Sequence, residues 1–289
     1  MRILLCTEGT QRSQHAIELC LLIAKASKSE VTIFGVTEVE SNERPLLEAL
    51  RQTQEVFRAE GVDVEIVSKH GEPISEISKR AQESNYDLVV IGGESKPTGE
   101  ISVLSQKAYE IIEILLLPVL VVPVARPGIR RILICSGGGT YIERAVRLVS
   151  GIARDLGASA TVFNVIPKAP VVVSERRERE LIPEVLLNSE SALAKNLRAA
   201  KEMLASMNVP AEIRVRAGIV DTEIAAEIEA GDYDLVVLGS KKSRDVFTEY
   251  LMGNMTRRLV NWAARPVLVV AGKIRSGRRR SWLERRGTP

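Results

Sequence analysis

Short apolar runs alternate along the chain with longer stretches that mix apolar and charged residues. In the first half the short runs are rich in β-branched residues and do not alternate cleanly between apolar and polar positions. That pattern is typical of parallel strands that are buried on both faces of a sheet. We therefore predict strands over residues 2–7, 30–37, 62–69, 87–92 and 118–123.

The stretches between these runs have the spacing of amphipathic helices. The apolar face of the first one consists of Ala16, Leu19, Cys20, Ile23 and Ala24. The apolar face of the second one consists of Leu46, Leu50, Thr53 and Phe57. Strands that alternate with helices predict a doubly wound parallel sheet with right-handed crossovers. Ligands of such a sheet bind at the carboxyl ends of its strands.

The second half of the chain repeats the first. The segment RILLCTEGT at Arg2 returns as RILICSGGGT at Arg131, and KHGEPISEI at Lys69 returns as RAGIVDTEI at Arg216. Because the order is kept while the offset grows from 129 to 147 positions, we infer a duplication with insertions. The helical faces repeat as Ala145, Leu148, Val149, Ile152 and Ala153, and as Leu193, Leu197, Ala200 and Leu204.

These patterns predict an α/β protein with two tandem, doubly wound, five-stranded parallel-sheet domains of the Rossmann-like kind. The first domain covers residues 1–125 and the second covers residues 129–272, with Pro127 and Gly128 in the short linker between them. An insertion of about 18 residues falls at 167–183 in the second copy. It is either a variable surface loop or a lid or partner-binding loop at the carboxyl edge.

The composition is that of a globular protein, with 45% apolar and 27% charged residues. The apolar runs are too short to cross a bilayer and no signal peptide precedes the first strand, so we expect a cytoplasmic protein. Cys6, Cys20 and Cys135 lie in apolar segments without CxxC spacing, which indicates reduced core thiols. With only His15 and His70 in the chain, we expect no histidine-based metal site.

The net charge of +3 conceals two regions of opposite sign. Residues 273–289 contain seven basic residues and one acidic residue, which leaves about −3 on the other 272 residues. We expect this basic tail to be a disordered, solvated end of the chain. Binding of nucleic acid or anionic lipid by the tail is the alternative, and we do not expect it.

The candidate functional segments are two glycine-bearing loops, each between a buried strand and a helix. The first follows YDLVVIGG near Gly92, and the second follows YDLVVLGS near Gly239. Such a loop can point backbone N–H groups at an anion.

Both halves open with a strand of the form ILxxT/S and close with the pair YDLVV-G and PVLVV. Over about residues 1–271 the chain thereby resembles the universal stress protein family in tandem form. In ATP-binding members of that family the loop reads Gly-x2-Gly-x9-Gly-Ser/Thr. An Asp after strand one and a Val near the end of strand two contact the nucleotide.

Carried over by this resemblance, the first copy keeps part of the pattern. The implied nucleotide-binding residues are Glu8, Gly9, Thr10, Val36, Gly92, Ser95, Ser105 and Gln106. Glu8 keeps the carboxylate with one more methylene, whereas Ser95 and Ser105 replace glycines and Gln106 replaces the hydroxyl residue. Serine restricts the positive-φ conformations that glycine permits, and Pro97 removes one N–H from the loop.

The second copy has lost other parts of the pattern. The implied binding residues are Gly137, Gly138, Gly139, Val165, Gly239, Lys242, Ser243, Gly253 and Asn254. Here Gly137 replaces the acidic residue, and Asn254 replaces the hydroxyl residue. The positive charges of Lys241, Lys242 and Arg244 can replace lost amide contacts to phosphate.

The resemblance implies a stress-response or regulatory protein that binds ATP or another adenine nucleotide, or another anion, in at least one copy. Mg²⁺ is expected only together with a nucleotide, slow ATP hydrolysis is the most activity expected, and no catalytic residue is assigned. A nucleotide-free scaffold with degenerate loops is the alternative. An enzyme of the wider nucleotide α-hydrolase-like group is a third hypothesis, and its additional motifs are absent from the sequence. The resemblance also implies that the two fifth strands pair within one chain. A further homodimer and the identity of any protein partner stay open.

Overall fold

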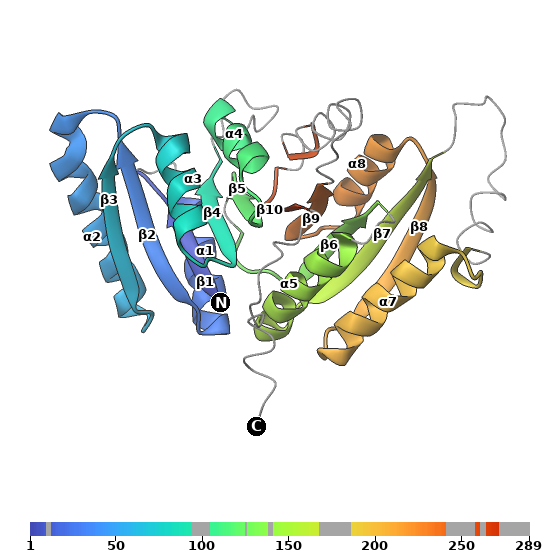
Figure 1. Cartoon of the computed structure of the whole chain (residues 1–289). Helices are drawn as coiled ribbons and strands as arrows, with labels where there is room; N and C mark the ends of the chain where they lie inside the picture. Colours follow the sequence, from blue (N-terminus) through green and yellow to red (C-terminus); the bar gives the residue numbers. More distant parts are fainter. Residues whose placement is uncertain are drawn as a thin grey trace.

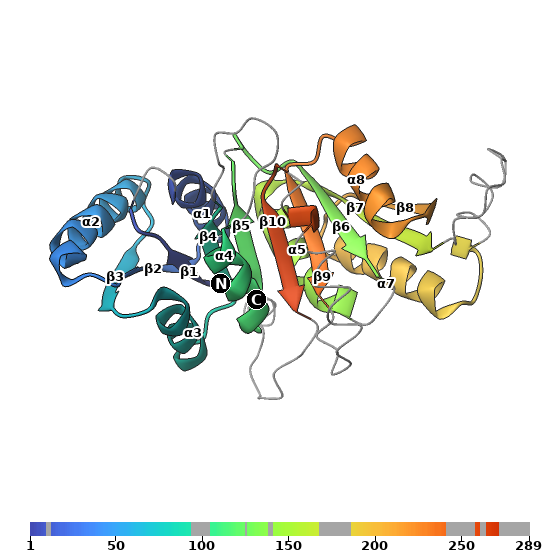
Figure 2. The ribbon, with the colours of Figure 1, turned by 90° about the horizontal axis from the view of Figure 1, so that it is seen from above.

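The computed structural model describes residues 1–9, 13–93, 105–124, 126–137, 141–167, 186–240, 258–260 and 264–271. These residues form one ten-stranded sheet with helices on both faces (Figures 1 and 2). The strand order is β3-β2-β1-β4-β5-β10-β9-β6-β7-β8. The five strands of each half are mutually parallel, and one antiparallel pair, β5 with β10, joins the halves. The predicted α/β class and tandem parallel sheets are confirmed.

The first half follows the predicted alternation of strands and helices. Its elements are β1 (Arg2–Cys6), α1 (Gln14–Ser27), β2 (Glu30–Thr37), the 3-10 turn η2 (Glu40–Asn42), α2 (Glu43–Ala59), β3 (Val64–His70), α3 (Pro73–Glu83), β4 (Leu88–Gly92), α4 (Gln106–Ile114) and β5 (Val119–Val122). His70 ends β3, because the pairing of β2 with β3 continues to Thr37 and His70.

The second half repeats this order. Its elements are β6 (Arg131–Ser136), α5 (Tyr141–Leu156), β7 (Ser159–Pro167), α7 (Ala192–Ser206), β8 (Ala211–Gly218), α8 (Val220–Ala230), β9 (Leu235–Ser240) and β10 (Val267–Ala271). The first copy of each strand therefore has its counterpart in the second copy. No helix among the described residues is long and apolar enough to cross a membrane.

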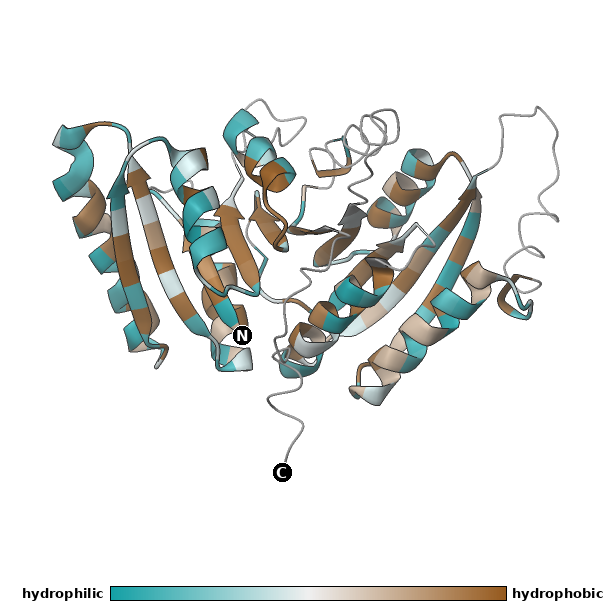
Figure 3. Ribbon diagram, in the orientation of Figure 1, coloured by the Kyte–Doolittle hydropathy of each residue, from teal (hydrophilic) through white to brown (hydrophobic). Residues whose placement is uncertain are grey.

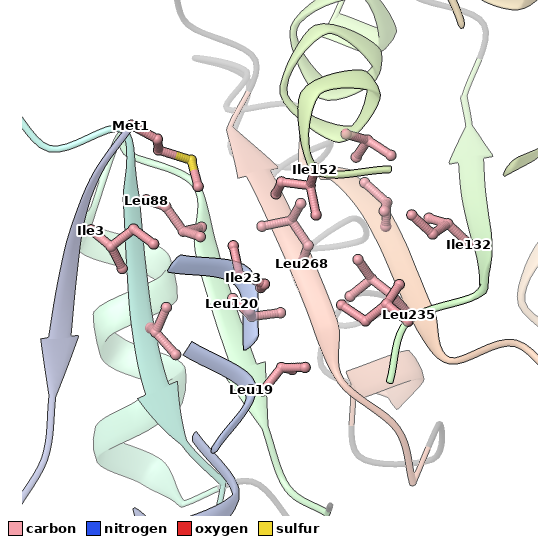
Figure 4. Close-up of a cluster of buried hydrophobic side chains, with 14 of the residues drawn as sticks. Met1, Ile3, Leu19, Ile23, Leu88, Leu120, Ile132, Ile152, Leu235 and Leu268 are labelled. Carbon is pink, nitrogen blue, oxygen red and sulfur yellow. The ribbon is translucent and has the colours of Figure 1, made fainter. Parts of the chain in front are cut away.

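The junction between the halves is a short apolar ladder. Leu268 of β10 pairs with Leu120 of β5. Both side chains are almost fully buried, and Figure 4 shows them near Ile23 of α1 and Ile152 of α5. Helices α1 and α5 also contact each other across the junction. One hydrophobic core therefore continues beneath both halves on this face of the sheet.

The two faces of the sheet are covered by different helices. Helices α1, α2, α5 and α7 cover the face whose core contains Leu120 and Leu268. Helices α3, α4 and α8, together with Leu259 and Val260, cover the other face. Successive strand residues alternate between the faces, as Ile3 and Leu4 do in β1. Figure 3 shows the resulting pattern, with apolar strands inside and polar residues on the outer sides of the helices.

Most of the predicted helical faces are buried. All five residues of the α1 face and all four of the α2 face are in the core. In the second half Leu148 and Leu193 are half-buried, whereas Val146 is buried without having been predicted. The buried face of α5 is therefore rotated from the predicted face toward α1, which α5 contacts at the junction between the halves.

The Tyr-Asp pair of each YDLVV motif supports the amino edge of the sheet. Asp87 Oδ2 accepts a hydrogen bond of 2.9 Å from the Arg2 backbone N–H, and the Arg2 guanidinium lies 5.5 Å from the centre of the Tyr86 ring. In the second copy Asp234 accepts the corresponding bond of 3.0 Å from the Arg131 N–H. The motif therefore has a structural role at the edge opposite the carboxyl ends of the strands.

Candidate functional site

A pocket lies at the carboxyl edge of the first half, where β1, β2 and β4 end and α4 begins. It is open to solvent, and the space inside it together with the solvent in front of it amounts to about 760 Å³. Four of the residues that the sequence singled out line it, namely Glu8, Val36, Gly92 and Ser105. Segments far apart in the chain are therefore brought together where the doubly wound topology predicts a ligand.

The inner wall of the pocket is apolar. Phe34 and Ile91 project from the strands, and Ile77 of α3 and Ile111 of α4 face them. All four are buried, and Val36, which packs against the same cluster, is half-buried. A pocket with such walls and a few polar groups at its mouth suits a flat heteroaromatic ring.

The turn after β1 is fixed by its own hydrogen bonds. The Thr7 N–H donates to the Phe34 carbonyl over 3.0 Å, and the Gly9 N–H donates to Thr7 Oγ1 over 2.9 Å. Gly9 has a φ of +66°, and a Cβ there would lie 2.3 Å from the Ala49 Cβ. Only glycine fits this position, and the turn presents the exposed Glu8 at the mouth of the pocket.

The polar side chains at the start of α4 form hydrogen bonds within that helix. Ser105 is the N-cap, and its Oγ accepts a hydrogen bond of 3.2 Å from the Ala108 N–H. Gln106 is exposed, and its Nε2 donates to Glu110 Oε1 over 2.9 Å. Ser105 lines the pocket, whereas Gln106 is not among the lining residues. The sequence prediction for Gln106 therefore lacks support from the geometry.

Gly93 was missed by the sequence analysis although it follows Gly92 directly. Its N–H donates to the Val122 carbonyl over 2.9 Å, and a Cβ would lie 2.8 Å from the Pro123 Cα. The loop therefore leaves β4 in close contact with the end of β5. The signal was the doubled glycine of the IGG sequence, in which the second glycine permits this close approach.

Lys107 is the basic residue of the pocket, and it too was missed. Its Nζ lies 3.0 Å from Glu38 Oε2, and this hydrogen bond is the main cause of a raised pKa of the lysine. The charges of Glu72 and Glu8 raise the pKa further. The signal in the sequence was a lysine in the first turn of a helix, where a positive charge opposes the helix dipole.

Glu72 directly precedes the pocket-lining Pro73 and interacts electrostatically with Lys107. It is the N-cap of α3, and its carboxylate accepts hydrogen bonds from the Ile74 N–H over 3.0 Å and from the Ser75 N–H over 2.7 Å. These bonds lower the pKa of the carboxyl group, with a further contribution from Lys107. The next residue, Pro73, lines the pocket. The mouth therefore carries Glu8, Glu72 and the Lys107–Glu38 pair.

The second half shows only part of the corresponding site. Val165 of β7 is buried, Gly137 follows β6 and is exposed, and Gly239 lies in β9 opposite Val270. Asn164 donates from Nδ2 to the Ser136 carbonyl over 2.6 Å. It stands where the first copy has Gly35. A buried amide therefore replaces a glycine at the second half's carboxyl edge.

Several predicted residues lie outside the described part of the chain. They are Thr10, Ser95, Gly138, Gly139, Lys242, Ser243, Gly253 and Asn254. Nearly all of the 167–183 insertion and the whole 273–289 tail also lie outside it.

Two other kinds of chemistry would involve the cysteine thiols or a bound metal ion. Burial raises the pKa of the Cys6 and Cys135 thiols to about 12 and also raises that of Cys20, so these thiols stay protonated near neutral pH. Among the described residues no group of three or more His, Cys, Asp or Glu side chains is arranged to hold a metal ion.

Comparisons with known proteins agree with this architecture. The sequence model of the Universal stress protein family matches residues 1–123 and again residues 128–271. A universal stress protein from Archaeoglobus fulgidus shares the fold with a TM-score of 0.73 and 17% identity, over 94% of this chain and 98% of that one. A functionally unknown protein from Pseudomonas aeruginosa has a TM-score of 0.70 and 17% identity, over 94% and 92% of the two chains.

A universal stress protein solved in complex with cAMP matches 42% of this chain and 95% of its own, with 25% identity and a TM-score of 0.36. A comparison with curated proteins found no match.

Proposed function

Because the chain belongs to the universal stress protein family, we propose that it is a regulatory protein that binds an adenine-containing ligand, a nucleotide or nucleoside, in the pocket of its first half. The observation that carries this proposal is the pocket itself. Glu8, Val36, Gly92 and Ser105 come from four separate segments and line one cavity with an apolar wall.

The chemistry of the pocket fits a heteroaromatic ring with a polar substituent. Phe34, Ile91 and Ile111 offer an apolar wall of the kind that excludes water from a flat base. The hydroxyl groups of Thr7 and Ser13 and the carboxylate of Glu8 offer polar partners for ribose hydroxyl groups. The apolar part supplies most of the free energy of binding, and the polar groups orient the ligand.

The second proposed function is a nucleotide-free scaffold. It is favoured by the start of α4, where Ser105 and Gln106 are engaged with their own helix. In this alternative the joined sheet acts as a rigid unit whose surface binds other proteins.

The two functions are separated by the ligand content of the purified protein. The full chain is denatured and the released small molecules are identified by mass spectrometry. Adenine-containing molecules near one per chain are expected. An empty protein whose melting temperature does not respond to millimolar adenosine, AMP or ATP would favour the scaffold.

A matched pair of variants assigns the binding to one half. Val36→Phe fills the pocket of the first half, and Val165→Phe makes the same change at the corresponding place in the second half. Calorimetric titration of the full chain is expected to lose the binding with Val36→Phe and to retain it with Val165→Phe. The opposite result would place the ligand in the second half.

A further inference from the structure

The charges around the mouth of the first pocket are predominantly negative. Lys107 is one positive charge among Glu8, Glu38 and Glu72, all three of which act electrostatically on its ammonium group. Lys107 is also already paired, because Glu38 holds it at 3.0 Å. Glu8, Glu38, Glu72 and Lys107 form the described rim of the pocket, and this rim has an excess of negative charge.

The adjoining segments of sequence do not reverse this excess. Residues 10–12 and 94–104 contain two basic residues, Arg12 and Lys96, and two acidic residues, Glu94 and Glu100. The net charge of these two stretches of sequence is zero.

Two polar side chains at the start of α4 have hydrogen-bond partners within their own helix. Ser105 Oγ caps its own helix, and the Gln106 amide is bonded to Glu110. Glu72 adds a negative charge, because two backbone N–H groups of α3 stabilise its carboxylate in the ionised form. None of these three side chains carries a positive charge, so none of them offsets the four negative charges of a triphosphate.

A divalent cation would be the other way to join carboxylates to phosphates. Such an ion needs several oxygen ligands within reach of one point. Among the described residues no group of three carboxylate, histidine or cysteine side chains meets that requirement. The described carboxylates therefore do not form a metal site by themselves, and without a bound cation they repel a phosphate chain.

We propose that the first pocket selects adenine-containing ligands of low negative charge, so that it binds a nucleoside in preference to a nucleoside triphosphate. This inference rests on the proposed function, and it names the ligand class of that same pocket. Apolar contacts hold the base, Thr7, Ser13 and Glu8 meet the ribose, and Glu8, Glu38 and Glu72 repel a polyphosphate.

The selectivity is tested by titrating the full chain with adenosine, AMP and ATP in EDTA at low ionic strength. Adenosine is expected to bind most tightly and ATP about tenfold or more weakly, because like charges within a few ångströms of each other repel strongly when salt is low. The difference is expected to shrink in 0.5 M salt. Each titration is repeated with Val36→Phe, so that only binding in the first pocket is counted.

A charge variant tests the cause of the selectivity. Glu38→Gln removes one negative charge and frees Lys107, so ATP is expected to bind about fivefold more tightly while adenosine is unaffected. The matched control is Glu60→Gln, which breaks the exposed pair of Glu60 with Lys25 on other helices and adds the same charge. This control is expected to leave both affinities unchanged.

The outcomes separate the two proposals. Tighter binding of ATP than of adenosine in the Val36-dependent site would overturn the charge selectivity and leave the proposed function standing. Equal effects of Glu38→Gln and Glu60→Gln would also overturn it, because the rim would then contribute nothing specific. Absence of binding by all three compounds would overturn the proposed function, and the inference with it.

Discussion

Tyr233 donates its hydroxyl hydrogen to the carboxylate of Glu227 over 2.7 Å, and Glu227 has no exposed surface. Arg214 and Arg216 of β8 hold the same carboxylate at 2.9 and 2.6 Å. The corresponding positions in the first half are Tyr86 and Arg80, and there the direction is reversed, with Arg80 Nε donating to the Tyr86 hydroxyl over 3.0 Å. The duplication thus kept the tyrosine and inverted the charge of its partner.

The charge inversion predicts unequal costs for two matching substitutions. Glu227→Ala leaves Tyr233 and two arginines without their buried acceptor, so we expect a loss of about 2–4 kcal/mol in the free energy of unfolding. Arg80→Ala removes a partly exposed group and is expected to cost about 1 kcal/mol or less. Urea unfolding followed by circular dichroism measures both. Equal costs would show that Glu227 and its three partners contribute no more to the free energy of unfolding than an exposed ion pair does.

The junction between the halves predicts coupled substitutions. Leu120 and Leu268 are paired across β5 and β10 and both are buried. Each change to alanine is expected to cost about 2–4 kcal/mol. The double variant should cost less than the sum, because the two side chains share contacts. Strictly additive losses in thermal or urea unfolding would mean that the halves do not stabilise each other through this pair.

The turn that presents Glu8 predicts a strong effect of a single methyl group. Gly9→Ala places a Cβ 2.3 Å from the Ala49 Cβ at a φ of +66°, so we expect a loss of about 2 kcal/mol or more. The control is Gly61→Ala, whose φ is +76° but whose Cβ would meet nothing within 4 Å. This control should cost about 1 kcal/mol, from the backbone conformation alone. Similar melting temperatures for the two variants would contradict the contact with Ala49.

The raised pKa values of the thiols predict a loss of stability at alkaline pH. Below about pH 7.5 the thiols are protonated in both states, and their contribution to stability does not change. As pH rises from 9 toward 12, an unfolded thiol loses its proton while Cys135 in the folded protein keeps it, because burial raises its pKa to about 12. Each such group then lowers the free energy of unfolding by up to about 1.4 kcal/mol per pH unit.

A cysteine variant isolates one of these contributions. Cys135→Ala removes one ionisable thiol, so the free energy of unfolding is expected to decline less steeply between pH 9 and pH 10.5, by up to about 1.4 kcal/mol per pH unit. The effect of the substitution on this slope is expected to be absent near pH 7.5. Urea unfolding at a series of pH values measures the slope. An unchanged slope would mean that the Cys135 thiol ionises as readily in the folded protein as in the unfolded chain.

The strands, the helix order and the duplication were all predicted from the sequence, because buried parallel strands produce uninterrupted β-branched runs and the copies confirm each other. Glu8, Val36, Gly92 and Ser105 were placed at one edge by topology and by family resemblance. The acidic rim was not predicted, because it depends on how the starts of α3 and α4 approach each other. Local sequence around Lys107 contains nothing about Glu38, which is 69 positions away in the chain.

The opposite charges of the two tyrosine partners were not predicted, for a related reason. Arg80 and Glu227 occupy matching positions on α3 and α8, and each alone is an ordinary helix-surface residue. Only the structure shows that each of them forms a hydrogen bond with a tyrosine. It also shows that Arg214 and Arg216 of β8 neutralise the charge of the buried Glu227.

The most direct test of the ligand site in the first half is hydrogen–deuterium exchange of the full chain with and without saturating adenosine. We expect slower exchange in peptides that cover residues 5–9 and 105–111, which form the turn with Glu8 and the start of α4. Peptides that cover 131–137 and 160–167 in the second half should exchange at unchanged rates. Protection confined to the second half, or no protection at any concentration up to the solubility limit, would contradict the account.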